Sequence, residues 1–406
     1  MISQGIRFWA GREDIQKELS YALYQLLSIN DVVVFDNKQL KNEPMKRVRK
    51  ELILPLLILV FMFNSCNVKQ EENQSIGNIL LKDFKPISLY NIPKTEVAEA
   101  MYPIIDAHTH VYAQSGEEIT NWVKTMDEIG IEKTIVLTQA VGEEFDSIIN
   151  EFAKYPGRFD LWCGFDYSNY DKPGYGPDAV RELERCFKAG AKGVGELGDK
   201  GKGMFFSRKA KAWGMHFDDE RLAPLLAKCG ELGMPVSIHV ADPIWMYEKM
   251  DSTNDGMMNA LKWRLDNQEV VGHAEMIDIL ERAVKRHPET TFVTCHLGNC
   301  SYDLNKLGGL FDKYPNLYAD ISARFGEIGT IPRFAAKFFQ KYQDRLLYGT
   351  DMGMKKDMYK NTFRILETED EHFYNPDYGY HWTLNGLALD TITLRKIYRE
   401  NALKIL

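Results

Sequence analysis

The 406-residue sequence predicts an α/β protein, a single (β/α)₈ barrel, and three observations lead to this prediction. From residue 101 onward, short apolar runs alternate with segments of helical periodicity, which is the pattern of βα units around a parallel sheet. The runs number eight, as a closed barrel requires. No G-x-G-x-x-G follows the first run, so an open, doubly wound sheet is the weaker alternative.

Each apolar run is followed by an amphipathic segment that we expect to form the helix of the same βα unit. The predicted strands are 104–111, 133–139, 159–167, 191–198, 235–241, 291–298, 317–323 and 346–352. The predicted helices are 117–130, 143–155, 177–189, 219–232, 274–287, 301–314, 332–342 and 393–403. Several of these helices have Pro in the first turn and Gly or Pro just past the end, as helices commonly do.

The extra length of the barrel lies in three long connections, which follow strands 4, 5 and 8. They span residues 199–218, 242–273 and 353–392. All three would lie at the carboxyl end of the barrel, where enzymes of this architecture build their active sites from βα loops. The predicted barrel domain covers residues 101–406.

The first hundred residues carry a predicted export signal. Met45 opens the basic sequence MKRVRKE, and residues 52–63 then form a run without charge. This run is shorter than the roughly 20 residues of a spanning helix, and its length and basic flank are typical of a secretory signal. An uncleaved anchor or a buried helix is the alternative.

The run ends at Cys66 and resembles a bacterial lipoprotein signal, followed by an acidic tether similar to those of Bacteroidetes surface lipoproteins. The resemblance implies that Cys66 is lipidated and that the chain is held at the cell envelope, in contact with the membrane only through that lipid. Residues 1–44 are then an over-extended translation start, 45–66 the signal, and 67–100 the tether and lead-in.

Composition and charge exclude several classes of protein. With 45% hydrophobic and 27% charged residues, the chain is neither disordered nor a polytopic membrane protein. The net charge is −8, and removal of residues 1–66, with nine basic and seven acidic side chains, would leave −10. This excess of negative charge argues against a nucleic-acid partner. The six cysteines contain no C-x-x-C pair, so a thiolate zinc site is not expected; a homo-oligomer is compatible with the sequence.

Ionisable side chains end five of the eight predicted strands. They are His108 and His110 of the D-x-H-x-H in strand 1, Glu196 in strand 4, His239 in strand 5, His296 in strand 6 and Asp351 of the G-T-D in strand 8. Because side chains alternate along a strand, His108 and His110 point to the same face and lie about 6.6 Å apart along the strand. Because the carboxyl ends of parallel strands meet at one end of a barrel, these side chains predict a metal centre. Imidazoles with one carboxylate suit Zn²⁺ best, with Mn²⁺ or Fe²⁺ as alternatives.

These motifs resemble those of the amidohydrolase superfamily, specifically its amidohydrolase-related (type 2) branch, from about residue 104 to the end of the chain. The resemblance implies that His108, His110 and His239 bind the metal and that Asp351 is both ligand and general base. His296 is the strand-6 histidine, which we expect to polarise the substrate carbonyl.

The expected reaction is hydrolysis of an amide, ester or lactone carbonyl of a small molecule by metal-bound hydroxide. The alternative is non-oxidative decarboxylation of an aromatic or unsaturated acid at the same metal site. Release of CO₂ without consumption of water would distinguish the two. A non-catalytic binding protein is disfavoured, because no expected ligand is missing.

Strand 4 leaves the number of metal ions open. Gly195-Glu196-Leu197-Gly198 is similar to the G-E-I-G of TatD-type hydrolases, in which Glu196 would bridge two ions. In the type 2 branch one ion is usual, and Glu196 would then bind substrate or form hydrogen bonds. We expect one ion, with a second if Glu196 bridges. A TatD-like activity on DNA is disfavoured by the acidic charge.

Contacts to the substrate are predicted in the loops. Arg324 follows strand 7 and would hold a substrate carboxylate, or else form a salt bridge with Asp320 or Glu327. Trp245 and Trp263, in the connection after strand 5, would form an aromatic lid or pack as loop core. The basic side chains after strand 4, among them Lys200 and Arg208, are expected to be solvated surface.

Overall fold

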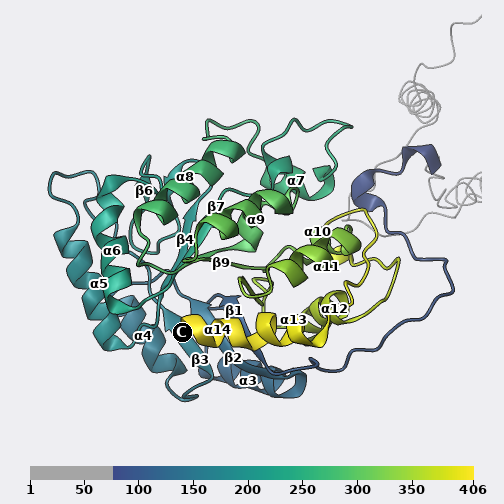
Figure 1. The fold of residues 1–406 in the computed structure, drawn as a ribbon, viewed down its shortest axis with the longest axis horizontal. Helices are drawn as coiled ribbons and strands as arrows, with labels where there is room; N and C mark the ends of the chain where they lie inside the picture. The colour runs from purple at the N-terminus through teal and green to yellow at the C-terminus, as the bar shows by residue number, and fades with distance from the viewer. Residues whose placement is uncertain (1–75) are drawn as a thin grey trace, which may run out of the picture. The chain divides into compact units, whose positions relative to one another are not determined.

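The computed structural model describes residues 76–406 (Figure 1). The predicted signal and Cys66 lie outside these residues. Residues 78–406 form one compact unit. Among the described residues, no helix combines the length and the apolar character needed to cross a bilayer.

Eight parallel strands form a closed barrel. They are β1 (Ile104–Thr109), β2 (Ile131–Leu137), β3 (Phe159–Trp162), β4 (Val194–Asp199), β7 (Val236–Val240), β8 (Phe292–Thr294), β9 (Leu317–Asp320) and β10 (Leu346–Leu347). They pair in the orders β1-β2-β3 and β4-β7-β8-β9-β10. A parallel bridge between Cys163 and Val194 joins β3 to β4, and the amide of Ala107 donates to the carbonyl of Tyr348 at 2.8 Å, which joins β10 to β1. The predicted barrel is therefore confirmed.

The helices surround the strands in Figure 1, each near the position that the sequence predicts. They are α3 (Gly116–Ile129), α4 (Gly142–Phe152), α5 (Pro177–Ala189), α6 (Ala223–Leu232), α8 (His273–Arg286), α9 (Leu304–Lys313), α11 (Pro332–Lys341), α13 (Thr391–Arg395) and α14 (Asn401–Ile405). The ends of α3 show why they form there: the hydroxyl of Ser115 accepts from the amide of Glu118, and Gly130 ends the helix at a φ of 85°, a conformation that suits glycine.

The long connections contain structure that the sequence pattern did not predict. A short antiparallel hairpin of β5 (Gly203–Met204) and β6 (Ala212–Trp213) follows β4. The connection after β7 holds α7 (Met257–Trp263), and the one after β10 holds α12 (Lys356–Glu367). A single turn, α10 (Phe325–Ile328), follows β9.

Several strands end earlier than predicted, and the reason bears on the site. After β8 the chain turns at His296, which has a φ of 61°, and after β10 it turns at Asp351, with a φ of 51°. Residues with such positive φ values do not continue a strand. His296 and Asp351 therefore lie on sharp turns just past β8 and β10.

A small apolar cluster joins residues from six of the eight strands and one residue of α14, including residues of β3 and β8, which are not neighbours, so these side chains meet inside the barrel. It comprises Ile105, Ala107, Ile135, Leu137, Trp162, Val293, Tyr318, Leu347 and Ala402. Gly193 makes room for Trp162, since a Cβ at Gly193 would lie 2.5 Å from the indole ring. A larger cluster packs the strands against the outer helices. The polar site rests on this apolar interior.

His273, the first residue of α8, predicts acid-dependent unfolding. Its Nε2 donates to the carbonyl of Asn299 at 3.0 Å, and burial lowers its pKa to about 4. Because the folded-state pKa lies below the ordinary value, the unfolded chain takes up a proton first, and stability is lost as the pH falls from about 6.5 to about 4. We expect the free energy of unfolding to decrease by up to about 3 kcal/mol from this group over that range. Urea titrations of the native protein and of His273→Phe measure it. An equal loss in both proteins would contradict the assignment.

Candidate metal centre

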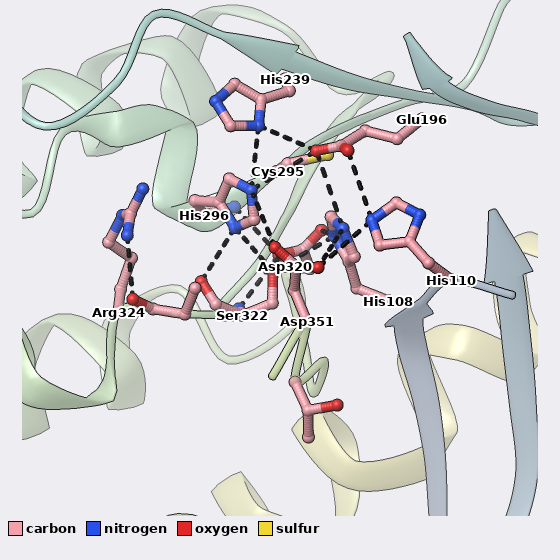
Figure 2. A network of polar contacts seen from close by, with 12 residues as sticks. His108, His110, Glu196, His239, Cys295, His296, Asp320, Ser322, Arg324 and Asp351 are labelled. Carbon is pink, nitrogen blue, oxygen red and sulfur yellow. Dashed lines mark hydrogen bonds and ion pairs between the residues drawn. The ribbon is translucent and has the colours of Figure 1, made fainter. Parts of the chain in front are cut away.

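Six side chains singled out in the sequence converge at the carboxyl end of the barrel (Figure 2). β1 supplies His108, with His110 just beyond it, β4 supplies Glu196 and β7 supplies His239. His296 and Asp351 come from the turns after β8 and β10. The structure thus brings together all of the metal ligands and catalytic residues that the sequence predicts.

One group of donor atoms forms around His108 and His110. The Nε2 atom of His110 lies 3.2 Å from Asp351 Oδ1 and 3.4 Å from Glu196 Oε2. The Nε2 atom of His108 lies 3.8 Å from Asp351 Oδ1 and 3.7 Å from Glu196 Oε1. It is buried and has no hydrogen-bond partner among the described residues. A buried imidazole nitrogen that has no hydrogen-bond partner and faces two carboxylates is the arrangement expected of a metal ligand.

A second group of donor atoms forms on the other side of Glu196. The Nδ1 atom of His239 lies 2.9 Å from Glu196 Oε1 and 3.1 Å from His296 Nε2. His296 Nε2 itself lies 3.4 Å from the same carboxylate oxygen. Glu196 therefore lies between two pairs of histidines, as Figure 2 shows.

Asp320 and Ser322 fix the orientation of two of these imidazoles. The Nδ1 atom of His108 donates to Asp320 Oδ2 at 2.9 Å, and the amide of His296 donates to the other Asp320 oxygen at 2.9 Å. The Nδ1 atom of His296 donates to the carbonyl of Ser322 at 3.0 Å. With their protons on Nδ1, both rings present a bare Nε2 to the site, which is the tautomer that a metal ligand needs.

This tautomer bears on the expected role of His296. Burial, with added effects from His239 and Arg324, lowers the pKa of His296. The ring is therefore neutral, and its Nε2 accepts a proton or a metal ion. It donates a hydrogen bond to a substrate carbonyl only when protonated, so the geometry fits a ligand better than the carbonyl-polarising group that we expected.

Asp242 and Lys200 hold the third imidazole. The Nε2 atom of His239 donates to Asp242 Oδ1 at 3.0 Å, and Lys200 Nζ lies 3.0 Å from the other oxygen of Asp242. The remaining nitrogen of His239 is thereby directed to Glu196. The sequence predicted a solvated surface position for Lys200. Lys200 instead lies at the wall of the site, because the hairpin after β4 folds back over the barrel.

The carboxylates of the site are ionised. Burial raises the pKa of Asp351, but the neighbouring His108 and His110 outweigh it and hold the pKa below its usual range. Burial likewise opposes ionisation of Glu196, and His239 and His110 keep its pKa well below the ordinary value. Both groups carry a negative charge at neutral pH.

The negative charge of these carboxylates raises the pKa values of three of the imidazoles. Burial lowers the pKa of His108, yet Asp320 and Asp351 raise it to about 9. Burial lowers the pKa values of His110 and His239 too, but Asp351 and Glu196 raise the pKa of His110, and Glu196 and Asp242 raise that of His239, above the ordinary value. The site attracts positive charge, and a divalent cation would take the place of these protons. The described residues therefore fit a metal centre of imidazole and carboxylate donors.

A cavity of about 490 Å³ opens above the cluster. Trp263, Arg208, Lys200, Tyr378 and Tyr380 contribute to its walls. Arg208 is exposed, as expected, but it also borders the cavity and donates to the carbonyl of Thr138 at 2.9 Å. Tyr378 and Tyr380 come from the long connection after β10.

Arg324 lines the cavity and makes no bond to Asp320. It donates to Asn299 Oδ1 through Nε at 3.2 Å and through Nη2 at 2.5 Å. Its Nη1 donates to the carbonyl of Ala323 at 2.9 Å, and Glu327 lies 3.6 Å from its Nε. Two of its five N–H donors remain for a ligand.

Trp245 does not line this cavity. It faces a neighbouring one of about 430 Å³, together with Trp382 and Tyr302. Tyr380 stacks on Trp382 with ring centroids 4.1 Å apart, and this pair separates the two cavities. Of the two predicted lid tryptophans, only Trp263 borders the metal cluster's cavity.

Asp320→Ala tests the supporting role of that carboxylate. The substitution leaves every donor atom of the cluster in place but frees the His108 ring, so we expect the metal dissociation constant to rise about 10- to 100-fold. Competition with a chromogenic chelator measures it. Asp303→Ala, which removes the carboxylate that caps α9, is the matched control and should leave the constant unchanged. Unaltered affinity in Asp320→Ala would contradict the role.

No curated protein matches the chain. The solved structures that resemble it include 2,6-dihydroxybenzoate decarboxylase from Rhizobium, with 17% identity over 75% of this chain and 98% of that chain and a TM-score of 0.46. 5-Carboxyvanillate decarboxylase from Novosphingobium aromaticivorans, complexed with manganese and 4-hydroxy-3-methoxy-5-nitrobenzoic acid, has 17% identity over 77% and 99% and a TM-score of 0.47. 4-Oxalomesaconate hydratase from Rhodopseudomonas palustris has 18% identity over 74% and 95% and a TM-score of 0.45.

The similarity to a known protein family extends over almost the whole barrel. The profile described as Amidohydrolase matches residues 105–406, which include every residue of the metal cluster. The chain therefore belongs to the amidohydrolase-related (type 2) family of metal-dependent enzymes.

Proposed function

We propose that the protein is a hydrolase that cleaves an amide, ester or lactone bond in a small substrate. The observation that supports this proposal is the position of Glu196, an ionised and buried carboxylate between two pairs of histidines. Its oxygens lie 2.9–3.7 Å from a nitrogen of each of the four rings. Donor atoms around one ion are separated by distances of this order, because each lies about 2 Å from the ion. The geometry thus supports two ion positions that share Glu196, the alternative left open by the sequence.

The ligands divide naturally between the two positions. His108, His110 and Asp351 would hold one ion, and His239 and His296 the other, with Glu196 common to both. Zn²⁺ is the ion that this donor set suits best, with Mn²⁺ or Fe²⁺ as alternatives. A bound divalent ion would make water acidic enough to attack at neutral pH and would polarise the carbonyl.

The chain's own groups would then handle protons and orientation. The side chain of Asp351 is 25% exposed, whereas that of Glu196 is 3% exposed, so Asp351 is the carboxylate of the cluster that the cavity reaches most readily. Tyr112 donates to Asp351 Oδ1 at 3.2 Å and holds it in place as the general base. Arg324 would orient a carboxylate on the substrate with its two remaining N–H groups.

Reaction in H₂¹⁸O tests the proposal directly. The purified protein is incubated with a panel of carboxylated esters, lactones and amides, and the products are examined by mass spectrometry. We expect one ¹⁸O atom in the acid formed at each turnover. Release of CO₂ from an aromatic or unsaturated acid, without incorporation of solvent oxygen, would instead assign the carboxy-lyase reaction and overturn the proposal.

Metal content tests the role of Glu196. We expect about two ions per chain in the native protein and about one in Glu196→Gln, because the amide cannot serve as a bridging anion. Elemental analysis after gel filtration measures both. Glu327→Gln, which changes another buried glutamate, is the control and should keep both ions. One ion in both proteins would restore the mononuclear site expected from the sequence.

A further inference from the structure

The segment that leads into the barrel exposes its apolar side chains. Leu89 is 95% exposed and Ile87 is 85% exposed. Ile79, Leu80, Phe84 and Tyr90 are also exposed, with values between 45% and 63%. Single exposed apolar residues are ordinary, but so many within twelve positions mark an interaction surface.

Around Ser88, this segment turns a polar side chain to the barrel and apolar side chains to the solvent. The hydroxyl of Ser88 lies 3.1 Å from His372 Nδ1, so the polar side chain faces the protein, whereas Ile87 and Leu89 on either side of it face away. Farther on, the amide and hydroxyl of Thr95 donate to Asp370 at 2.7–3.1 Å. These bonds fix which side of the chain meets the barrel. The apolar side is therefore available to something other than the barrel.

The charge of the segment indicates the kind of surface that it fits. Residues 79–94 contain Lys82, Lys85 and Lys94 against a single acid, Asp83. This local excess of positive charge occurs in a chain whose net charge is −8. Apolar side chains accompanied by lysines are the composition of segments that lie in the interface of anionic bilayers.

We propose that residues 79–94 bind the surface of an anionic phospholipid bilayer, with the apolar side chains among the lipid headgroups and the lysines at the phosphates. The sequence adds a reason for this occupant. The predicted lipid attachment site, Cys66, precedes Ile79 by 13 residues, which span at most about 45 Å, so a lipidated chain would hold the segment close to the membrane. This contact is separate from the lipid itself and does not depend on the reaction.

Vesicle sedimentation tests the proposal with an unlipidated chain of residues 76–406, which contains the whole compact unit. Vesicles of phosphatidylethanolamine and phosphatidylglycerol should bind it, and added salt should weaken the binding. Ile87→Ser with Leu89→Ser should lower the bound fraction at least about five-fold. Replacing the three lysines by Gln should lower binding to these vesicles to the level seen with neutral phosphatidylcholine.

The control is Ile392→Ser with Leu403→Ser, which removes two apolar side chains that are 55% and 45% exposed elsewhere on the barrel. Its binding should equal that of the native chain. Near-UV circular dichroism and metal content show that each variant is folded. Absence of binding, or equal binding by the Ile87 and Leu89 variant, would overturn the proposal. So would a native dimer that this variant dissociates, since a second copy would then cover the surface.

Discussion

Asp351→Asn should lower kcat/KM by about 10³-fold or more while most of the metal stays bound. The charge and hydrogen bonds of His108 and His110 keep the native carboxyl ionised, so it is ready to accept a proton at neutral pH. An amide of the same shape still accepts the Tyr112 hydrogen bond but is not a base, and loss of a general base costs this order of magnitude. Glu196 and the two histidines remain to bind the ion.

The measurement is steady-state kinetics together with elemental analysis of the same samples. Asp377→Asn is the matched control, because Asp377 lines the same cavity outside the cluster. Its kcat/KM should change only a few-fold. Near-native rates in Asp351→Asn would remove the general-base assignment, and parallel loss of metal and activity would make Asp351 a ligand first.

His239→Ala should lose about one metal ion per chain and reduce activity to background. The ring bonds to Glu196 and Asp242 through its two nitrogens and lies 3.1 Å from His296. Without it, one imidazole and one shared carboxylate remain at that position, which is too few donors for a stable zinc site. The ion held by His108 and His110 should persist.

Elemental analysis after dialysis against metal-free buffer measures this loss. His273→Ala, a buried histidine outside the cluster, should keep the native metal content. Full metal retention in His239→Ala would remove that residue from the ligands. Loss of all metal would show that a single ion binds both pairs of histidines.

The sequence predicted the barrel well because its information is local. Apolar runs of strand length alternate with amphipathic helices, and each unit can be recognised without knowledge of its neighbours. The predicted strand ends were less accurate. The turns at His296 and Asp351 depend on left-handed backbone conformations, which are uncommon for every residue except glycine and which the sequence pattern does not mark.

The cluster itself was predictable for the same reason, since each of its side chains ends an apolar run. The groups that orient it were not. Asp320 pairs with His108 across 212 residues of sequence, and only the closed barrel brings the two together. The acid within the seventh apolar run was the one sequence signal for Asp320. Trp245 lies outside this cavity because it packs against the stacked Tyr380 and Trp382, and this contact between the connections after β7 and β10 exists only in the folded chain.

The bonds between Thr95 and Asp370 have a mechanical consequence. Asp370 also pairs with Arg364 of α12 at 2.7 Å, and it lies in the connection that supplies Tyr378 and Tyr380 to the cavity. A pulling force on the amino-terminal end of the chain would therefore reach this connection before it reached β1. The carboxylate of Asp370 thus links the segment that precedes β1 to the connection that forms part of the cavity wall.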